Sequence, residues 1–130
     1  MEQLDIIFKQ LKLLLIKYAD NFDARDEFIG STAKRKKEEY HLYGKKIISI
    51  ANRKPQPTFV VGIIKQKDFV GFYSMPIYSH LKSFELSQEL KKLLKGKSCF
   101  HIKKLDKELI FEIESVIVQG IELYKKEGWI

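Results

Sequence analysis

The spacing of apolar residues changes twice along this chain, and this change constrains the fold more than any other feature. Near the N-terminus, apolar residues recur at helical spacing and predict an amphipathic helix that ends near Asp20: Leu4, Ile7, Phe8, Leu11, Leu14, Leu15 and Tyr18. A second stripe predicts a C-terminal helix capped by Asp106: Leu109, Ile110, Ile113, Ile117, Gly120, Ile121 and Tyr124. Between them, the period shortens toward two, which is typical of strands.

The clearest strands are residues 58–64 and 69–74, and weaker candidates cover 27–32, 38–43 and 46–51, with a turn-rich connection at 52–57. Residues 75–84 are expected to be irregular because Pro76 cannot donate a ladder hydrogen bond. Ser87 can cap a short helix that stops at Gly96, and residues 97–103 alternate as one more strand.

This order of elements predicts an α+β fold. We expect a two-layer sandwich in which an antiparallel sheet of about five or six strands carries the N- and C-terminal helices on one face. The length of 130 residues fits a single domain spanning 1–130.

Gly120 lies inside the last helix, where it costs about 1 kcal/mol relative to Ala. It therefore indicates close approach to a neighbouring element.

Two glycines of the central hairpin suggest a depression in the sheet. If the turn is centred on Gln66 and Lys67, Gly62 lies directly opposite Gly71. The rim on the same face would then be apolar and aromatic: Val60, Ile64, Phe69 and Tyr73. Such a floor can hold a small ligand, or a terminal helix can pack into it.

Residues 96–104 (GKSCFHIKK) contain the Gly-Lys-Ser ending of a phosphate-binding loop. That loop requires a glycine where this chain has Lys91, and it lies between a strand and a helix, so the sequence argues against it.

Cys99 and His101 share one face of the predicted strand, where they can be structural residues, line a ligand pocket, or take part in metal binding or catalysis. No nucleophile, base and orienting group can be placed together, so the sequence does not favour an enzyme.

Four carboxylates lie within eight residues after the first helix: Asp20, Asp23, Asp26 and Glu27. Oxygen ligands of this kind suit hard cations, although acidic residues also cap backbone groups in ordinary solvated turns. The cluster is thus a candidate metal site.

The formal charge of +7 favours anionic partners through long-range attraction. One compact basic run is a candidate anion-binding site: Lys34, Arg35, Lys36 and Lys37. Nucleic acid is therefore a conceivable partner, although no recognised binding motif is present.

The single cysteine excludes an intrachain disulfide, and charges interrupt the first apolar stretch. We expect a cytoplasmic monomer or homodimer without a membrane partner.

Three segments of the chain resemble the YdhG-like family, domain of unknown function 1801: residues 69–78 (FVGFYSMPIY), 96–104 (GKSCFHIKK) and 120–129 (GIELYKKEGW). The similarity begins at about residue 26. It implies a small bacterial α+β protein with an antiparallel sheet flanked by helices and with no established reaction or cofactor. Some members of the wider family are described as frataxin-like iron chaperones that depend on an acidic ridge. Here only the carboxylates at 20–27 match that ridge, because the first helix carries Lys9, Lys12 and Lys17.

These observations predict a non-enzymatic domain that binds a small ligand or a partner. One alternative is a frataxin-like iron carrier that uses the four carboxylates. The other is a protein that binds nucleic acid or an anionic surface through its lysines.

Overall fold

The computed structural model describes residues 2–29 and 37–130, and these residues form one six-stranded antiparallel sheet with helices. The strand order is β1-β2-β3-β4-β6-β5. The strands are β1 (Asp23–Arg25), β2 (Glu39–Ile48), β3 (Gln56–Lys65), β4 (Val70–Ser74), β5 (Leu94–Lys95) and β6 (Cys99–Ile102). The helices are α1 (Gln3–Ile16), α2 (Met75–Ser79), α3 (Gln88–Leu93) and α4 (Lys107–Glu127), with short 3₁₀ helices η1 (Ala19–Asn21) and η2 (Leu81–Ser83).

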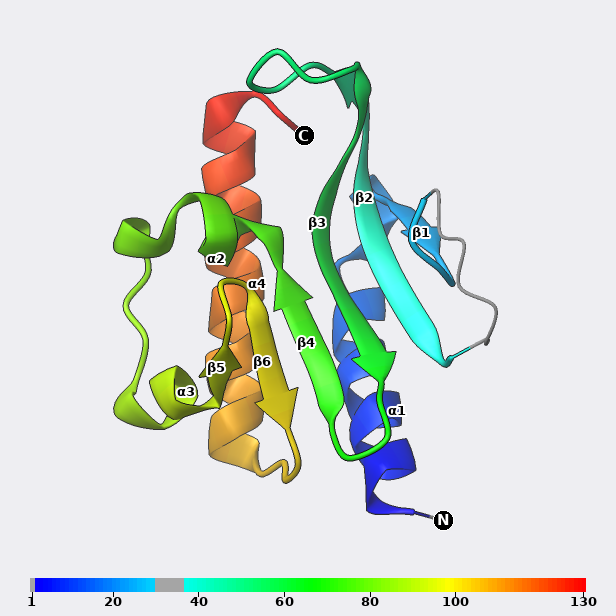
Figure 1. Cartoon of the computed structure of the whole chain (residues 1–130), viewed down its shortest axis with the longest axis vertical. Helices are drawn as coiled ribbons and strands as arrows, with labels where there is room; N and C mark the ends of the chain where they lie inside the picture. The colour runs from blue at the N-terminus through cyan, green and yellow to red at the C-terminus, as the bar shows by residue number, and fades with distance from the viewer. Residues whose placement is uncertain (1, 30–36) are drawn as a thin grey trace.

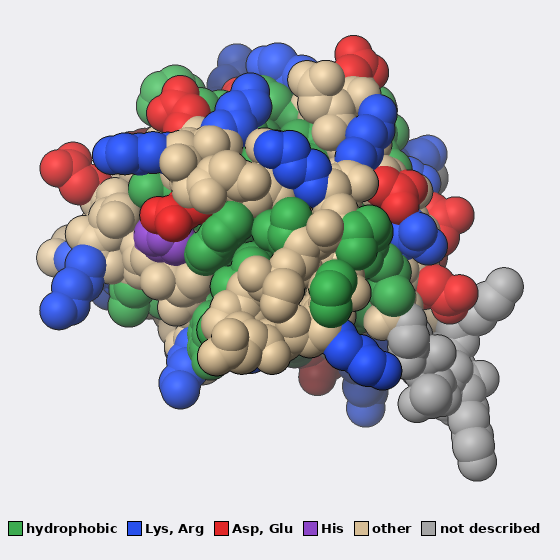
Figure 2. Space-filling view, turned by 90° about the horizontal axis from the view of Figure 1, so that it is seen from above, with side chains coloured by type: hydrophobic (Ala, Val, Ile, Leu, Met, Phe, Trp, Pro, Cys, Tyr) green, Lys and Arg blue, Asp and Glu red, His purple; other side chains and the backbone are tan. Residues whose placement is uncertain are grey.

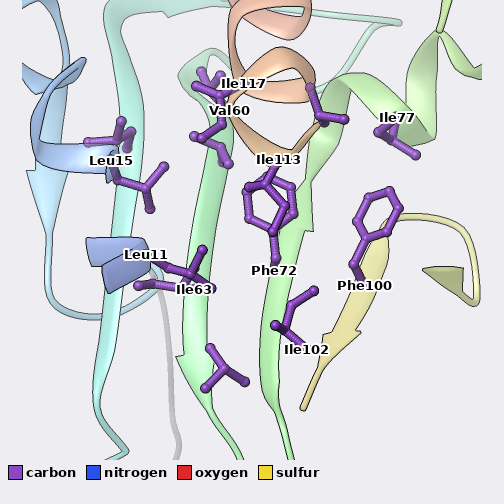
Figure 3. Packing of buried hydrophobic residues seen from close by; sticks show 14 of the residues in the cluster. Leu11, Leu15, Val60, Ile63, Phe72, Ile77, Phe100, Ile102, Ile113 and Ile117 are labelled. Carbon is purple, nitrogen blue, oxygen red and sulfur yellow. The ribbon is translucent and has the colours of Figure 1, made fainter. Parts of the chain in front are cut away.

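The two long helices, α1 and α4, lie side by side against one face of the sheet (Figure 1). Their apolar stripes face inward. Leu11 and Leu15 of α1 and Ile113 of α4 pack over the central strands, where Phe72 and Phe100 are almost fully buried (Figure 3). The predicted α+β sandwich with terminal helices on one face is confirmed.

Both ends of α4 have the capping residues that its sequence predicts or allows. The Asp106 carboxylate accepts a hydrogen bond from the backbone N–H of Leu109 at 2.8 Å, which satisfies one of the free donors of the first turn. Gly128 ends the helix in the left-handed conformation, with φ of 78°. The chain reverses there, and the N–H of Trp129 donates to the carbonyl of Tyr124 at 2.9 Å. This reversal returns Trp129 toward the sheet.

Gly120 of α4 is the point of close approach that the sequence predicts. A Cβ atom added to Gly120 would lie 2.8 Å from Cγ and 3.1 Å from Cβ of Pro76, which is in the first turn of α2. Because a proline ring cannot rotate away, Gly120→Ala should lower the free energy of unfolding by about 1–2 kcal/mol, although alanine is the better helix former. Urea denaturation measures this change. Glu122→Ala, on an exposed position of the same helix, should stay within about 0.5 kcal/mol of the parent, and an equal effect of both substitutions would contradict the contact.

Three local predictions are wrong. Residues 75–84 are not irregular throughout. Proline is tolerated in the first turn of a helix, and Pro76 lies in the first turn of α2, which the Ser74 hydroxyl caps. Gly96 does not stop a helix. Its positive φ of 69° serves instead the turn between β5 and β6. The predicted strands at 38–43 and 46–51 are one irregular strand, β2.

The first predicted strand, at 27–32, is also wrong in its described part. The edge strand β1 lies earlier in the chain and pairs Asp23 with Tyr43, whereas residues 27–29 form no strand. Residues 30–32 lie outside the described residues.

The register of the central hairpin differs from the prediction by two residues. Lys65 pairs with Val70, so the turn is centred on Lys67 and Asp68, and Gly62 lies opposite Tyr73 rather than Gly71. A β-bulge then changes the side-chain alternation of β3. Leu42 pairs with Val61 and Tyr43 pairs with Phe59, which leaves Val60 without a partner on β2.

Candidate functional site

The space above Gly62 is filled by the ring of His41. His41 is directly opposite Gly62 across the strands, is fully buried, and would collide through Nδ1 with any Cβ at position 62. Phe28 stacks on the outer side of the imidazole with 3.9 Å between ring centroids, at an interplanar angle of 26°. Gly62 therefore provides space for a buried histidine, not the floor of an open pocket.

The other predicted pocket residues are separated in a similar way. The Tyr73 ring covers Gly71, where an added Cβ would be 2.7 Å from Cε2 of the tyrosine. Because of the bulge, Val60 points into the core toward α4 (Figure 3). The predicted depression over Gly62 and Gly71 is thus occupied by the protein's own side chains.

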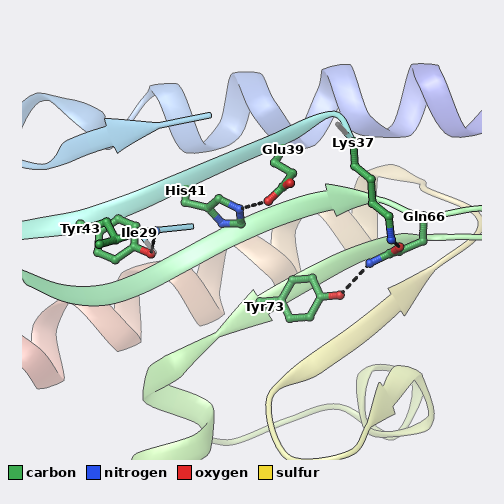
Figure 4. Close-up of polar contacts among 7 residues, drawn as sticks. All are labelled: Ile29, Lys37, Glu39, His41, Tyr43, Gln66 and Tyr73. Atoms are coloured by element: carbon green, nitrogen blue, oxygen red, sulfur yellow. Dashed lines mark hydrogen bonds and ion pairs between the residues drawn. The ribbon is translucent and has the colours of Figure 1, made fainter. Parts of the chain in front are cut away.

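His41 takes part in a small polar arrangement beneath Phe28. Its Nε2 lies 2.8 Å from Oε1 of Glu39, whereas Nδ1 has no partner among the described residues (Figure 4). Burial lowers the pKa of His41, and the hydrogen bond to Glu39 and the charge of that carboxylate oppose this effect. The imidazole is therefore held mainly in its neutral form.

The lowered pKa of His41 makes stability depend on pH. Above the ordinary histidine value of about 6.5, the imidazole is neutral in both the folded and the unfolded state. As the pH falls below it, the unfolded state binds a proton that the folded state resists, so stability decreases by at most about 1.4 kcal/mol per pH unit. We expect the urea midpoint to fall between about pH 7.5 and about pH 5.5.

His41→Gln should flatten this pH dependence, because an amide can still donate to Glu39 but does not titrate. His101→Gln is the matched control, because it removes another histidine, on β6. Burial also lowers the pKa of His101, but its ring is partly exposed. If the slope of His41→Gln equals that of the parent, the buried imidazole is not its source.

Cys99 and His101 lie on the same face of β6, as predicted, but they meet different neighbours. Cys99 is opposite Tyr73, and burial raises the pKa of its thiol, which therefore stays protonated. The His101 ring stacks on Phe69 with 3.7 Å between centroids. The imidazole and the thiol thus pack against different aromatic rings of the sheet.

The four carboxylates after the first helix are not brought together into one group. In residues 2–29 and 37–130, no group of three or more His, Cys, Asp or Glu side chains is placed to hold a metal ion. Asp20 belongs to η1, whereas Asp23 belongs to β1 and binds Arg25, with 2.8 Å between Oδ2 and Nη2. Asp26 and Glu27 follow as exposed residues. The direction of β1 and the ion pair between Asp23 and Arg25 thus keep the four carboxylates apart, although they are close in the sequence.

The predicted anion-binding run lies mostly outside the described residues: Lys34, Arg35 and Lys36 belong to the part of the chain that the structure leaves out. The ammonium of Lys37 donates to the side-chain carbonyl of Gln66, whose amide in turn donates to the Tyr73 hydroxyl at 3.2 Å (Figure 4). Lys37 thus contacts the β3–β4 turn.

At one end of the sheet, β2 and β3 extend beyond β4 toward the C-terminal end of α4 (Figure 1). A cavity of about 320 Å³ lies among the residues of these elements. Its walls come from the β2–β3 hairpin, from α2, from the last turns of α4 and from Ile29. Most of them are apolar or aromatic: Ile29, Tyr43, Ile48, Ile50, Ala51, Pro57, Phe59, Met75, Tyr78, Tyr124 and Trp129. The polar or charged ones are Arg53, Gln56, Thr58 and Ser79.

Thr58 brings an unsatisfied polar group to this cavity. Its side chain is buried, with 8% of the residue's surface exposed, and its hydroxyl has no hydrogen-bond partner among the described residues. A buried hydroxyl without a partner is costly, typically by about 1–3 kcal/mol. By contrast, the hydroxyls of Ser79 and Tyr124 share a hydrogen bond of 3.1 Å. Thr58 thus lines the cavity through its other atoms, while its hydroxyl oxygen is buried.

The C-terminal residues fix Trp129 at the edge of the cavity. The indole packs edge-on against Tyr124, with 5.0 Å between ring centroids, and against His80 at 5.7 Å. The following residue, Ile130, packs over Gly44 of β2, where a Cβ would be 2.7 Å from the isoleucine Cγ2. Since the chain has one tryptophan, all of its tryptophan fluorescence comes from a residue that lines this cavity.

Comparison with protein families, curated proteins and solved structures finds no match to this chain. The resemblance to the YdhG-like family therefore stays a prediction from the sequence. Within the described residues, no helix is both long and apolar enough to cross a membrane.

Proposed function

We propose that this protein binds a small, largely apolar ligand in the cavity between the β2–β3 hairpin, α2 and the end of α4, without chemical conversion of that ligand. The observation that carries the proposal is the cavity itself. Its volume of about 320 Å³ lies at the lower end of the range of roughly 300–1,000 Å³ for ligand sites. Its lining is apolar and aromatic with a few polar groups, as is usual in such sites.

The polar groups at the cavity support a specific orientation of the ligand. The exposed side chains of Arg53 and Gln56 can pair with a polar group of the ligand. The aromatic walls provide large contact areas at low cost in conformational entropy. These features fit a binding protein better than a catalyst.

The proposal is tested by titrating the protein with a neutral aromatic compound, naphthalene-2-carboxamide, while the fluorescence of Trp129 is recorded. We expect a saturable change. Ile48→Phe adds volume to the cavity wall and should weaken binding by roughly five- to 150-fold, as overpacking of about 1–3 kcal/mol implies. Nuclear magnetic resonance shifts of the lining residues locate the bound compound independently.

Ile47→Phe is the matched control. It makes the same substitution on the adjacent residue, which is 62% exposed and does not line the cavity. Its affinity should equal that of the parent. If both substitutions have the same effect, or if the compound shifts only residues outside the cavity, ligand binding at this site is wrong.

A further inference from the structure

The walls of the cavity are uniformly basic where they are charged. Between Tyr40 and Lys67, the sequence contains no Asp or Glu, and the same holds from Phe69 to Phe84. These two stretches contain the hairpin and α2, which form most of the lining. Their cations are Lys45, Lys46, Arg53, Lys54, Lys65, Lys67 and Lys82. Lys65, at the other end of β3, is paired with Glu2, Asp5 and Glu38, so the excess positive charge near the cavity comes from the β2–β3 hairpin.

Arg53 is the cation at the cavity itself. A tight turn fixes its backbone: its N–H donates to the carbonyl of Ile50 at 3.0 Å, across Ala51 and Asn52, which adopt positive φ angles of 52° and 63°. The Ser49 hydroxyl donates to the carbonyl of Arg53. In the part of the chain that the structure describes, its guanidinium forms no ion pair with a carboxylate.

The α4 side of the cavity carries charges of both signs in its last turn. In the last turn of α4, Glu127 lies 3.5 Å from Nε2 of His80, and Lys125 and Lys126 precede it. The carbonyl of Gly128, at the negative end of the helix, faces the ammonium of Lys46 at 3.4 Å. Figure 2 shows this end of the molecule, with hydrophobic side chains near its centre and Lys and Arg side chains on several sides of them.

We infer that the ligand of this cavity is an organic monoanion with an apolar, ring-bearing body, of the arylcarboxylate class, and that Arg53 binds its carboxylate. The inference rests on the proposed function, since it concerns the same cavity. The aromatic walls receive the ring, and the guanidinium at the hairpin turn pairs with the carboxylate through its fork of N–H donors. The surrounding lysines raise the local concentration of anions.

The test compares two compounds of nearly the same shape, naphthalene-2-carboxylate and naphthalene-2-carboxamide, by Trp129 fluorescence at low salt. The parent protein should bind the carboxylate about three- to tenfold more tightly, a modest factor because Arg53 is exposed. Arg53→Gln should remove this preference, so that the ratio of the two affinities falls to about one. Lys54→Gln, which removes the neighbouring charge outside the lining, should retain most of the preference.

The outcomes separate the inference from the proposed function. If both compounds bind the cavity with equal affinity, the cavity binds ligands but the anionic class is wrong. If the preference persists in Arg53→Gln, Arg53 is not the anion-binding residue. If neither compound binds, the proposed function is overturned and the inference with it. Added salt should weaken the binding of the carboxylate and leave that of the carboxamide unaffected.

Discussion

Gly62→Ala should lower the free energy of unfolding by about 3 kcal/mol, at the upper end of the usual cost of overpacking. The new methyl group would overlap Nδ1 of His41 and lie 2.8 Å from its Cε1. The imidazole cannot yield easily, since Phe28 stacks on one side of it and Glu39 binds its Nε2. Urea denaturation followed by circular dichroism measures the loss.

A double-mutant cycle identifies the cause of this loss. In a His41→Ala background, Gly62→Ala should cost much less, because the space that the ring occupied is empty. Gly71→Ala provides a comparison: its methyl group would meet the ring of Tyr73, which is only half-buried and can move outward, so we expect a loss of about 1 kcal/mol. Additive effects of the substitutions at 41 and 62 would contradict the steric explanation.

Tyr124→Ala should destabilise the protein by about 3–5 kcal/mol, the cost of truncating a large buried aromatic residue. Tyr124 is 1% exposed, and its ring packs against both Trp129 and His80. The substitution should also shift the emission of Trp129 to longer wavelength, because the indole loses a neighbour that excludes water. Denaturation and fluorescence spectra of the same samples measure both effects.

Tyr124→Phe separates the ring from the hydroxyl. It removes only the hydrogen bond to Ser79 and should cost about 1 kcal/mol, with little change in the emission of Trp129. If Tyr124→Ala is no more destabilising than Tyr124→Phe, the ring is not the packing element that the structure indicates.

The helices and the fold class could be predicted from the sequence because their signals are local and repeated. The stripe from Leu109 to Tyr124 runs through several turns of α4, and Asp106 marks the start of that helix. By contrast, the register of the β3–β4 hairpin depends on one turn. Its residues Gln66, Lys67 and Asp68 include no glycine or asparagine that would fix the turn position, so an error of two residues was possible.

The cavity could not be predicted because its walls come from segments far apart in the sequence. Ile29, Thr58, Tyr78 and Trp129 meet only after the sheet has formed and α4 has packed on it. The burial of His41 was missed for a related reason: its pairing with Gly62 depends on the register between β2 and β3. One signal was readable in advance, namely the absence of acidic residues from Tyr40 to Lys67.

The bulge at Val60 makes the order of side chains along β3 depend on a single residue. Toward the β3–β4 turn from this point, odd-numbered residues such as Val61 and Ile63 face the helices. On the other side, Phe59 instead joins the aromatic rings of Phe28 and Tyr43 on the opposite face. Deleting Val60 would therefore leave a strand that alternates regularly from Phe59 to Ile63, whereas deleting a neighbouring paired residue would exchange the inner and outer faces on one side of it. The length of β3 is thus as much a part of its fold as its composition.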